Sequence, residues 1–378
     1  MCARSPLTHD TPGEEVRPAA PPAWQPRDSD RSRLQYLCPA MSAILILGGT
    51  RNLGHVAALA LLQAGHEVTI LNRGQTRDDL PRDVERLRAD RSDTNQLRAA
   101  IGRRSFDLIF DATTYTGADA RQAIDVFSGR AGRYLFVSSG QVYLVREGLE
   151  RPFREADYAG RVMGEPPRDS ADHPSWLYGA DKRDAEDAFM AARSEAGFPV
   201  ITLRLPMVAS ERDHCGRIQG YAARILDGGP LLLPEGEGLP LRHVYVADVA
   251  RLVVGLAASD AGSGRDYNIS FGSSMKLSRF IALLAAAAGR TPDILTVDRG
   301  KLVERGLLPH CSPFSGRWMS ELDNTQSLAH LGAAGISYTV PEDYLPKLLE
   351  DFTTRWAANS MVPEGYAQRR EEIAFAGR

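Results

Sequence analysis

Tyr178 and Lys182 lie four positions apart in a segment with strong helical periodicity, so their side chains are expected to share one helix face. A neighbouring cation favours the ionised form of an acid, and Lys182 is therefore expected to lower the pKa of Tyr178 from its reference value of about 10. Ser139 follows a hydrophobic segment and is expected to hydrogen-bond the substrate oxygen with which Tyr178 exchanges its proton. These three catalytic candidates are predicted to polarise a carbonyl or deprotonate an alcohol while a nicotinamide exchanges hydride.

A glycine-rich turn follows an aliphatic run near the start of the chain. Residues 43–47 read AILIL, and residues 48–54 read GGTRNLG immediately before a helical pattern. Glycine lets the backbone approach a pyrophosphate closely, and a helix N-terminus offers N–H groups and partial positive charge. A purely structural turn is the alternative, but the position between strand and helix favours dinucleotide binding. The predicted cofactor contacts in this turn are Gly48, Thr50, Arg51, Asn52, Leu53 and Gly54.

The end of the second expected strand bears on which dinucleotide is used. NAD enzymes carry an acidic residue about 20 positions after the glycine turn, where it binds the adenine ribose hydroxyls. Here the segment reads Leu71-Asn72-Arg73. Asn72 removes the carboxylate that would repel a 2′-phosphate, while Arg73 and Arg51 supply cations able to bind it. NADP is therefore predicted over NAD, the alternative being that Arg73 is a solvated loop charge.

Two aspartates close the next strands of the expected sheet. Ligands of such sheets bind at the carboxyl ends of the strands. Asp90 is therefore expected to reach the adenine ring, and the segment from Asp111 through Ala112 and Thr113 is expected to lie near the nicotinamide ribose. Either aspartate can instead cap its own turn.

The elements that must position these residues alternate between strand and helix. Strands are predicted over 43–47, 67–71, 84–89, 106–110, 134–137 and 200–204, and helices over 52–64, 94–101, 118–127 and 178–196. The first helix is expected to bury Val56, Leu59, Ala60 and Leu62. This alternation predicts right-handed βαβ units and an α/β fold, a Rossmann-type doubly wound parallel sheet.

After residue 205 the alternation weakens, and glycine and proline punctuate shorter pieces. We expect a dinucleotide-binding domain over 41–205 and a smaller, intertwined C-terminal substrate-binding lobe over 206–378, with 240–270 returning to the Rossmann core. Residues 1–40 lack apolar stretches and are predicted to be a disordered leader before a natural start at Met41, with a functional tail as the alternative.

Composition and charge exclude several classes of protein. The chain has 378 residues, 45 basic and 48 acidic side chains and a net charge of −3, which provides no general attraction to nucleic acid or anionic membrane. Its four cysteines show no C-x-x-C spacing, so no metal site or disulfide framework is expected and a cytoplasmic location is favoured. No apolar run approaches the length of a membrane span. A monomer or homodimer acting on a small molecule is expected.

The order of these motifs resembles the extended or atypical short-chain dehydrogenase/reductases of the NAD-dependent epimerase/dehydratase family, over about residues 43–350. The matching segments are 48–54, Asp90, 138–143, 178–182, 203–206 and 244–250. The resemblance implies a dinucleotide site at the first motif, catalytic roles for Ser139, Tyr178 and Lys182, and a nicotinamide contact at Pro206.

Three departures from the family pattern concern the substrate. Arg51 replaces the usual middle glycine, as in chloroplast stem-loop-binding proteins. Residues 207–211 read MVASE where sugar-nucleotide epimerases usually carry an Asn-Pro segment. Arg242 lies one position from where their diphosphate-binding arginine aligns. These departures argue against a sugar nucleotide without excluding one.

The substrate pocket is expected between the lobes, formed by the loop after Gly140, residues 207–221 and the loop around Gly306. The candidate substrate contacts are Tyr115, Tyr143, His214, Arg217, Tyr221 and His243. Each of these side chains can equally be a surface or packing residue.

The leading hypothesis is an NADP-dependent oxidoreductase that uses Tyr178 as general acid/base. An epimerase or dehydratase with tightly bound NAD(P) needs the same three residues and stays open as a second hypothesis. A third hypothesis is a non-catalytic RNA-binding or cofactor-sensing protein on the same fold. The absence of a basic stripe with interleaved aromatic residues argues against RNA binding.

Overall fold

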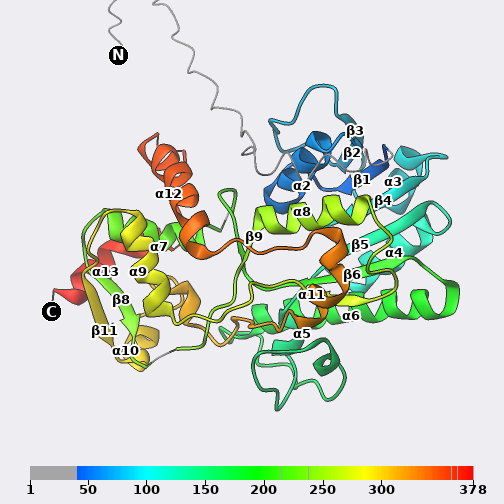
Figure 1. Cartoon of the computed structure of the whole chain (residues 1–378). Coiled ribbons are helices and arrows are strands. Elements are labelled where there is room, and N and C mark those ends of the chain that lie inside the picture. Colours follow the sequence, from blue (N-terminus) through cyan, green and yellow to red (C-terminus); the bar gives the residue numbers. More distant parts are fainter. Residues whose placement is uncertain (1–40, 214, 237, 359, 364, 378) are drawn as a thin grey trace, which may run out of the picture. The chain divides into compact units, whose positions relative to one another are not determined.

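A seven-stranded parallel sheet forms the centre of the protein in a computed structural model that describes residues 41–378 except 214, 237, 359, 364 and 378 (Figure 1). The predicted leader, residues 1–40, lies outside the described residues. The strand order is β10-β6-β5-β4-β1-β2-β3, and every neighbouring pair is parallel. The strands are β1 (Ala43–Leu47), β2 (Glu67–Asn72), β3 (Glu85–Arg88), β4 (Phe106–Asp111), β5 (Ala131–Ser139), β6 (Val200–Leu205) and β10 (Asp266–Asn268). The predicted Rossmann-type fold is confirmed.

Helices cover both faces of this sheet, and the alternation of β1 shows why. Ile44 and Ile46 point into the hydrophobic cluster shared with one helix layer, whereas Leu45 and Leu47 point into the cluster on the opposite face. The first layer consists of α2 (Asn52–Gln63) and α8 (Val246–Ala257). The second consists of α3 (Thr94–Ile101), α4 (Gly117–Phe127) and α6 (His173–Ala196).

The start of α6 and the buried face of α2 differ from the sequence prediction. The helix α6 begins at His173 rather than at Tyr178, because Pro174 occupies the first turn, where its missing N–H is not needed. In α2 the small residues Ala57 and Ala58 are fully buried between the sheet and α8. The four residues expected to be buried, Val56, Leu59, Ala60 and Leu62, are partly exposed. Val56, Leu59 and Leu62 nevertheless pack against the core, so the predicted core face of α2 is confirmed in part.

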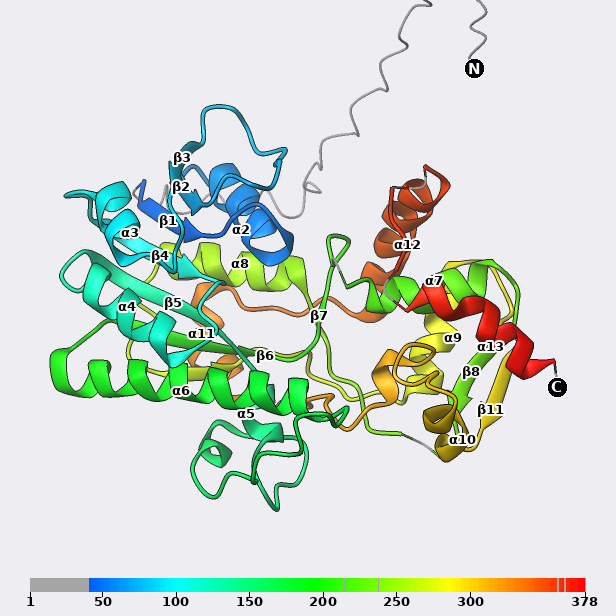
Figure 2. The same ribbon diagram turned by 180° about the vertical axis from the view of Figure 1, so that it is seen from behind.

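The second half of the chain adds a smaller set of elements and also returns to the main sheet (Figure 2). Strand β10 pairs with β6, and α8 packs on α2. The short strands are β7 (Val208–Ala209) with β9 (Val244–Tyr245), and β8 (Leu231–Pro234) with β11 (Ile294–Val297). The further α-helices are α5 (Gln141–Leu144), α7 (Arg217–Leu226), α9 (Leu277–Ala287), α10 (Arg299–Glu304), α11 (Thr325–Leu331), α12 (Pro341–Ala357) and α13 (Arg369–Ala376). The 3₁₀ turns are η1 (Glu155–Tyr158), η2 (Pro313–Ser315), η3 (Gly332–Ala334) and η4 (Tyr366–Gln368).

The C-terminal helix α13 is fastened to α7 by buried charges. Arg224 on α7 pairs with Glu372 on α13, and both side chains are fully buried. Arg369 donates to Asp227 at the end of α7, with Nε–Oδ2 2.6 Å. These contacts hold the end of the chain against the helix that begins with Arg217.

Among the described residues, no helix combines the length and apolar character needed to cross a bilayer. The same part of the chain contains no group of three or more His, Cys, Asp or Glu side chains placed to hold a metal ion.

The glycine turn brings α2 directly against the sheet. A Cβ atom on Gly54 would lie 2.8 Å from the backbone nitrogen of Gly49. A Cβ on Gly49, whose φ is +83°, would lie 2.7 Å from Ile70 Cγ2. Side chains at these positions would push the N-terminus of α2 away from the end of β1.

Gly54→Ala is therefore expected to lower the free energy of unfolding by about 2 kcal/mol, because the new methyl group meets backbone that has no room to move. Chemical denaturation measures this change. Gly164→Ala is the matched control, since nothing lies within 4 Å of its Cβ position, and its effect should stay within about 0.5 kcal/mol. Equal stabilities for the two variants would contradict the close packing of the turn.

Candidate functional site

A cleft with a volume of about 1060 Å³ runs along the carboxyl edge of the sheet. Ligands of doubly wound sheets bind at this edge, and the volume exceeds that of a pocket for one drug-sized ligand. Its lining includes all residues of the glycine turn, the ends of β2, β3, β4, β5 and β6, and the segment 318–320. The cleft has room for a dinucleotide and a small second molecule together.

The glycine turn forms one end of this cleft. Every predicted contact of the turn lies in the cleft lining: Gly48, Thr50, Arg51, Asn52, Leu53 and Gly54. Asn52 has a φ of 40°, and within the described residues its buried Oδ1 atom has no hydrogen-bond partner. A buried polar atom without a partner, beside the free N–H groups of a helix N-terminus, fits a polar ligand such as a dinucleotide.

Asn72 joins the end of β2 to the glycine turn. Its Nδ2 atom donates to the Gly48 carbonyl oxygen at 3.3 Å, and its Oδ1 atom accepts from the Gly74 backbone N–H at 2.8 Å and from the side chain of Arg88. Arg73 and Arg51 line the cleft beside it. The sequence analysis missed Arg88. The signal for it was its position at the end of the third strand, because the strand ends form the edge at which ligands bind.

The two aspartates play different parts. Asp90 lines the cleft while its Oδ1 atom accepts from the Ser92 backbone N–H at 2.9 Å. Asp111 is fully buried and accepts from the backbone N–H groups of Thr113 and Thr114 at 2.8 and 3.1 Å, so it caps its own turn. Ala112 and Thr113, but not Asp111, line the cleft.

Arg91 is a further residue that the sequence analysis missed. Its Nη1 atom lies 2.9 and 3.0 Å from the two carboxylate oxygens of Asp111. Burial by itself raises the pKa of Asp111, but the Arg91 charge and hydrogen bonds from Thr114 and Tyr134 outweigh it and lower the pKa to about 2. Arg91 lines the cleft, so this ion pair joins the segment after β3 to the end of β4, across the ends of β1 and β2 that lie between them in the sheet. In the sequence, the signal for Arg91 was a second charged residue directly after Asp90.

Tyr178 and Ser139 meet in the cleft. Tyr178 is 36% exposed, and its ring centroid lies 6.4 Å from that of Tyr115. Burial raises the pKa of the Tyr178 hydroxyl, and a hydrogen bond with Ser139 and the charge of Arg217 only partly offset this. Tyr178 is therefore protonated near neutral pH.

Lys182 is buried behind Tyr178 and is already neutral at the pH at which Tyr178 ionises. Its Nζ atom donates to the carbonyl oxygens of Thr114 and Val137 at 2.6 and 2.8 Å and lies 6.0 Å from the centroid of the Tyr178 ring. Burial lowers the pKa of Lys182 to about 8. Lys182 thus loses its proton before Tyr178 ionises, and a neutral amine cannot favour the tyrosinate. The expected lowering of the Tyr178 pKa was wrong for this reason.

The candidate substrate contacts divide into two groups. Tyr115 and Arg217 line the cleft, as does Pro206 at the expected nicotinamide position. Tyr143, Tyr221 and His243 do not line it. His214 lies outside the described residues.

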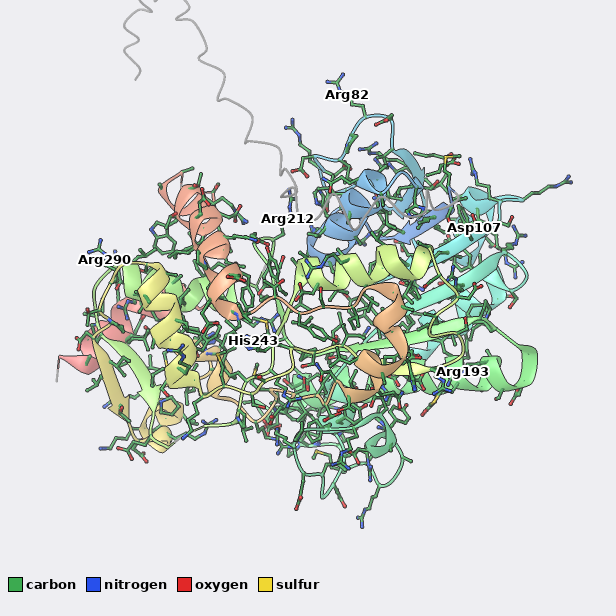
Figure 3. The ribbon with its side chains drawn as sticks, in the orientation of Figure 1. Arg82, Asp107, Arg193, Arg212, His243 and Arg290 are labelled. Carbon is green, nitrogen blue, oxygen red and sulfur yellow. The ribbon has the colours of Figure 1, made fainter. Side chains whose placement is uncertain are left out.

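Packing explains why those three side chains are not in the cleft. The Tyr221 hydroxyl is 2.9 Å from Ser312 Oγ and accepts from the Phe314 backbone N–H at 3.1 Å. His243 packs edge-on against Phe314 in the core, and burial lowers its pKa to about 3 (Figure 3). Tyr143 is fully buried and donates to Asn268 Oδ1 at 2.9 Å. Their expected substrate contacts were wrong.

The far wall of the cleft also differs from the prediction. The loop around Gly306 does not contribute, whereas Trp318, Met319 and Ser320 do. The side-chain amide of Gln141 donates to the Trp318 carbonyl oxygen at 2.8 Å and joins the two walls. A Cβ atom on Gly140 would collide with Ser320, so the glycine after Ser139 was the signal for this close approach.

The model of the NAD dependent epimerase/dehydratase family matches residues 44–270. This match covers more than half of the chain, so the chain belongs to that family, as its motifs predicted. Proteins similar to it include a reductase, an epimerase and a dehydratase that was solved with NAD.

Three curated relatives show distant similarity. The chloroplast stem-loop binding protein of 41 kDa b of Arabidopsis thaliana is 24% identical over 49% of this chain and 54% of its own length. The 2′-dehydrokanamycin reductase of Streptomyces kanamyceticus is 25% identical over 58% of this chain and 59% of its own. The chain thus spans little more than half the length of these two relatives. The UDP-glucose 4-epimerase of Corynebacterium glutamicum is 22% identical over 65% and 80%.

Solved structures share the fold. The UDP-glucose 4-epimerase of Thermotoga maritima, solved with UDP-glucose, superposes with a TM-score of 0.63 at 18% identity. The superposition covers 83% of this chain and 99% of the other. Both chains therefore have the same Rossmann-type architecture.

Tyr221→Phe is expected to lower the free energy of unfolding by about 1–3 kcal/mol, because it leaves the buried Phe314 N–H without its acceptor. Dinucleotide binding should be unchanged, since Tyr221 lies outside the cleft. Chemical denaturation and cofactor titration measure the two effects. Wild-type stability combined with lost cofactor binding would place Tyr221 in the site after all.

Proposed function

We propose that the protein is an NADP-dependent oxidoreductase that reduces a carbonyl of a small molecule, or oxidises the corresponding secondary alcohol. The observation that carries this proposal is the protonated Tyr178 hydroxyl, which lines a dinucleotide-sized cleft together with Ser139. Family membership supports nicotinamide chemistry in this cleft. A tyrosine that keeps its proton at neutral pH is suited to give that proton to a carbonyl oxygen.

The bound nicotinamide would supply the hydride. Ser139 orients the carbonyl by hydrogen-bonding its oxygen, and Tyr178 donates its proton to that oxygen as negative charge develops there. Lys182 is positively charged below a pH of about 8 and stabilises the tyrosinate that proton donation leaves behind. Loss of the Lys182 proton removes this stabilisation, so reduction should slow as the pH rises through about 8.

Cations at the end of β2 favour NADP. Arg51 and Arg73 line the cleft, Arg88 contacts Asn72 beside them, and the carboxylate that would repel a 2′-phosphate is replaced by the Asn72 amide. The turn residues and Asp90, Ala112, Thr113 and Pro206 would complete the cofactor contacts. Lys182 is 2% exposed and does not line the cleft, so the structure does not support the predicted contact of Lys182 with the nicotinamide ribose.

The substrate end of the cleft offers a cation and an aromatic surface. Arg217 and Tyr115 line it beside Tyr178, which suits a small, electron-rich carbonyl compound. We propose the dinucleotide-binding domain over 41–205 and the substrate-binding lobe over 206–378. We also propose a cytoplasmic monomer or homodimer whose partner is the substrate rather than nucleic acid or membrane.

Tyr178→Phe is expected to abolish NADPH-dependent reduction in a screen of carbonyl compounds, because the proton donor is gone. Cofactor affinity should change by no more than about twofold, since the ring remains. Stopped-flow measurement of NADPH oxidation and fluorescence titration of NADPH test the two expectations. Full turnover in this variant would refute the mechanism.

Arg73→Glu is expected to weaken NADPH binding by about 10- to 100-fold and to leave NADH binding nearly unchanged, because a carboxylate would replace a cation beside the 2′-phosphate. Titration of the apo-protein with both reduced cofactors measures this. Arg103→Glu is the control, since Arg103 is exposed and lies outside the cleft lining. Tighter binding of NADH than NADPH by the wild type would sink the cofactor assignment.

An epimerase or dehydratase that regenerates its nicotinamide is the second candidate. The family match and the similarity to the UDP-glucose 4-epimerase, which extends over 80% of that protein, favour it. Absorbance of the reduced cofactor distinguishes the two candidates during turnover. Stoichiometric consumption of NADPH supports net reduction, whereas product formation without net consumption supports epimerisation or dehydration.

A further inference from the structure

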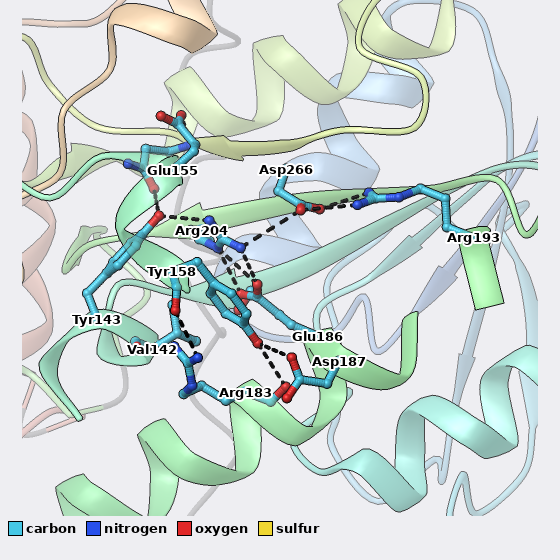
Figure 4. Close-up of polar contacts among 12 residues, drawn as sticks. Val142, Tyr143, Glu155, Tyr158, Arg183, Glu186, Asp187, Arg193, Arg204 and Asp266 are labelled. Carbon is cyan, nitrogen blue, oxygen red and sulfur yellow. Dashed lines mark hydrogen bonds and ion pairs between the residues drawn. The ribbon is translucent and has the colours of Figure 1, made fainter. Parts of the chain in front are cut away.

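A buried ion pair lies directly behind the reaction centre. Glu186 on α6 and Arg204 on β6 have side chains that are 0% and 1% exposed. Arg204 Nε lies 3.1 and 2.9 Å from the two carboxylate oxygens of Glu186, and Nη2 adds a contact of 2.5 Å (Figure 4). Removing two charges from water is costly, and apolar residues of similar volume often serve stability equally well. Such a pair is better suited to fixing geometry than to adding stability.

Glu186 clamps the two strands that carry the reaction centre. Ser138 on β5 and Arg204 on β6 are paired neighbours in the sheet, and both hydrogen-bond with Glu186. Successive side chains of a strand point to opposite faces. The next residues, Ser139 and Leu205, therefore point the other way, and both line the cleft. Ser138 also lines the cleft, and anchoring Ser138 and Arg204 to Glu186 fixes the neighbouring Ser139 with them.

Helix α6 makes a second contact with β5, one helical turn before Glu186. Lys182 donates to the Val137 carbonyl oxygen at 2.8 Å, and Glu186 accepts from Ser138, the next residue of the strand. Tyr178, Lys182 and Glu186 follow one another at intervals of four, which places them on one face of α6. The position of Tyr178 relative to Ser139 therefore depends on both contacts between α6 and β5.

Arg204 extends the clamp to the substrate side. Its Nη1 atom donates to the Tyr143 hydroxyl at 2.8 Å, and that hydroxyl donates to Asn268 Oδ1 on β10 (Figure 4). Tyr143 belongs to α5, the short helix that begins with the cleft residue Gln141. One guanidinium group therefore joins α6, β6, α5 and, through Tyr143, β10.

We propose that Glu186 and Arg204 form a positioning pair that holds Ser139, Lys182 and α5 in the geometry required for proton transfer, an inference that rests on the proposed function. Neither side chain lines the cleft. Both act through the residues that do.

Ser138→Ala tests the clamp without leaving a buried charge unpaired. The wild-type Gly140 N–H donates to the Leu205 carbonyl oxygen at 2.8 Å, at the strand ends that Glu186 holds together. Amide hydrogen exchange of the apo-protein over residues 138–144, measured by mass spectrometry, is expected to be about tenfold faster in this variant. Exchange equal to that of the wild type would overturn the proposal, even where Glu186→Gln fails to fold.

Glu372→Gln is the matched control. It removes the carboxylate of Arg224–Glu372, an equally buried Arg–Glu pair between α7 and α13. Faster exchange is expected around these two helices, with no change over residues 138–144. Acceleration over 138–144 equal to that in Ser138→Ala would show a general loss of stability and overturn the positioning role.

Turnover provides the second readout. Glu186→Gln is expected to lower kcat by about 10- to 100-fold and to leave the Kd for NADPH within about twofold, while Glu372→Gln keeps the wild-type kcat. An equal loss of kcat in both variants would overturn the proposal. The two proposals can fail separately. If the wild-type protein reduces no carbonyl compound but the variants show the expected exchange pattern, the proposed function is refuted and the positioning role of Glu186 and Arg204 is still supported.

Discussion

The geometry of the site depends on two hydrogen bonds from the buried ammonium group of Lys182. The acceptors are the carbonyl oxygens of Thr114, just after β4, and of Val137, near the end of the neighbouring strand β5. These bonds fasten α6 to the carboxyl edge of the sheet. The same burial lowers the pKa of Lys182 to about 8. Tyr178 on the same helix face therefore keeps its proton when Lys182 has already lost its own.

Two buried carboxylates favour the positive charge of Lys182. Asp111 and Glu186 both favour the charged form of Lys182, although burial outweighs them. Each carboxylate is in turn paired with an arginine, Asp111 with Arg91 and Glu186 with Arg204. The first pair joins the ends of β3 and β4, and the second joins β5, β6 and α6. A charged lysine is thus accommodated in the core without an unpaired carboxylate beside it.

Local patterns made the sheet, the glycine turn and the Tyr178–Lys182 spacing predictable, because each depends on residues close in sequence. The wall formed by residues 318–320 was not predictable in this way, since Gln141 meets Trp318 across 177 positions. Single aromatic residues carried no directional signal, and Tyr143 and Tyr221 turned into the core. The pKa of Tyr178 was also misjudged, because spacing shows which groups are neighbours but not how deeply each is buried.

The ionisation of Tyr178 tests the account most directly. The tyrosine rings can be labelled with ¹³C at the ζ position and followed by NMR from pH 6 to 11, with the Tyr178→Phe variant identifying the signal. The account predicts that this signal does not titrate until the pH exceeds the usual tyrosine value of about 10. Titration of Tyr178 near neutral pH would contradict both its role as a protonated donor and the expectation that Lys182 loses its proton at a lower pH than Tyr178.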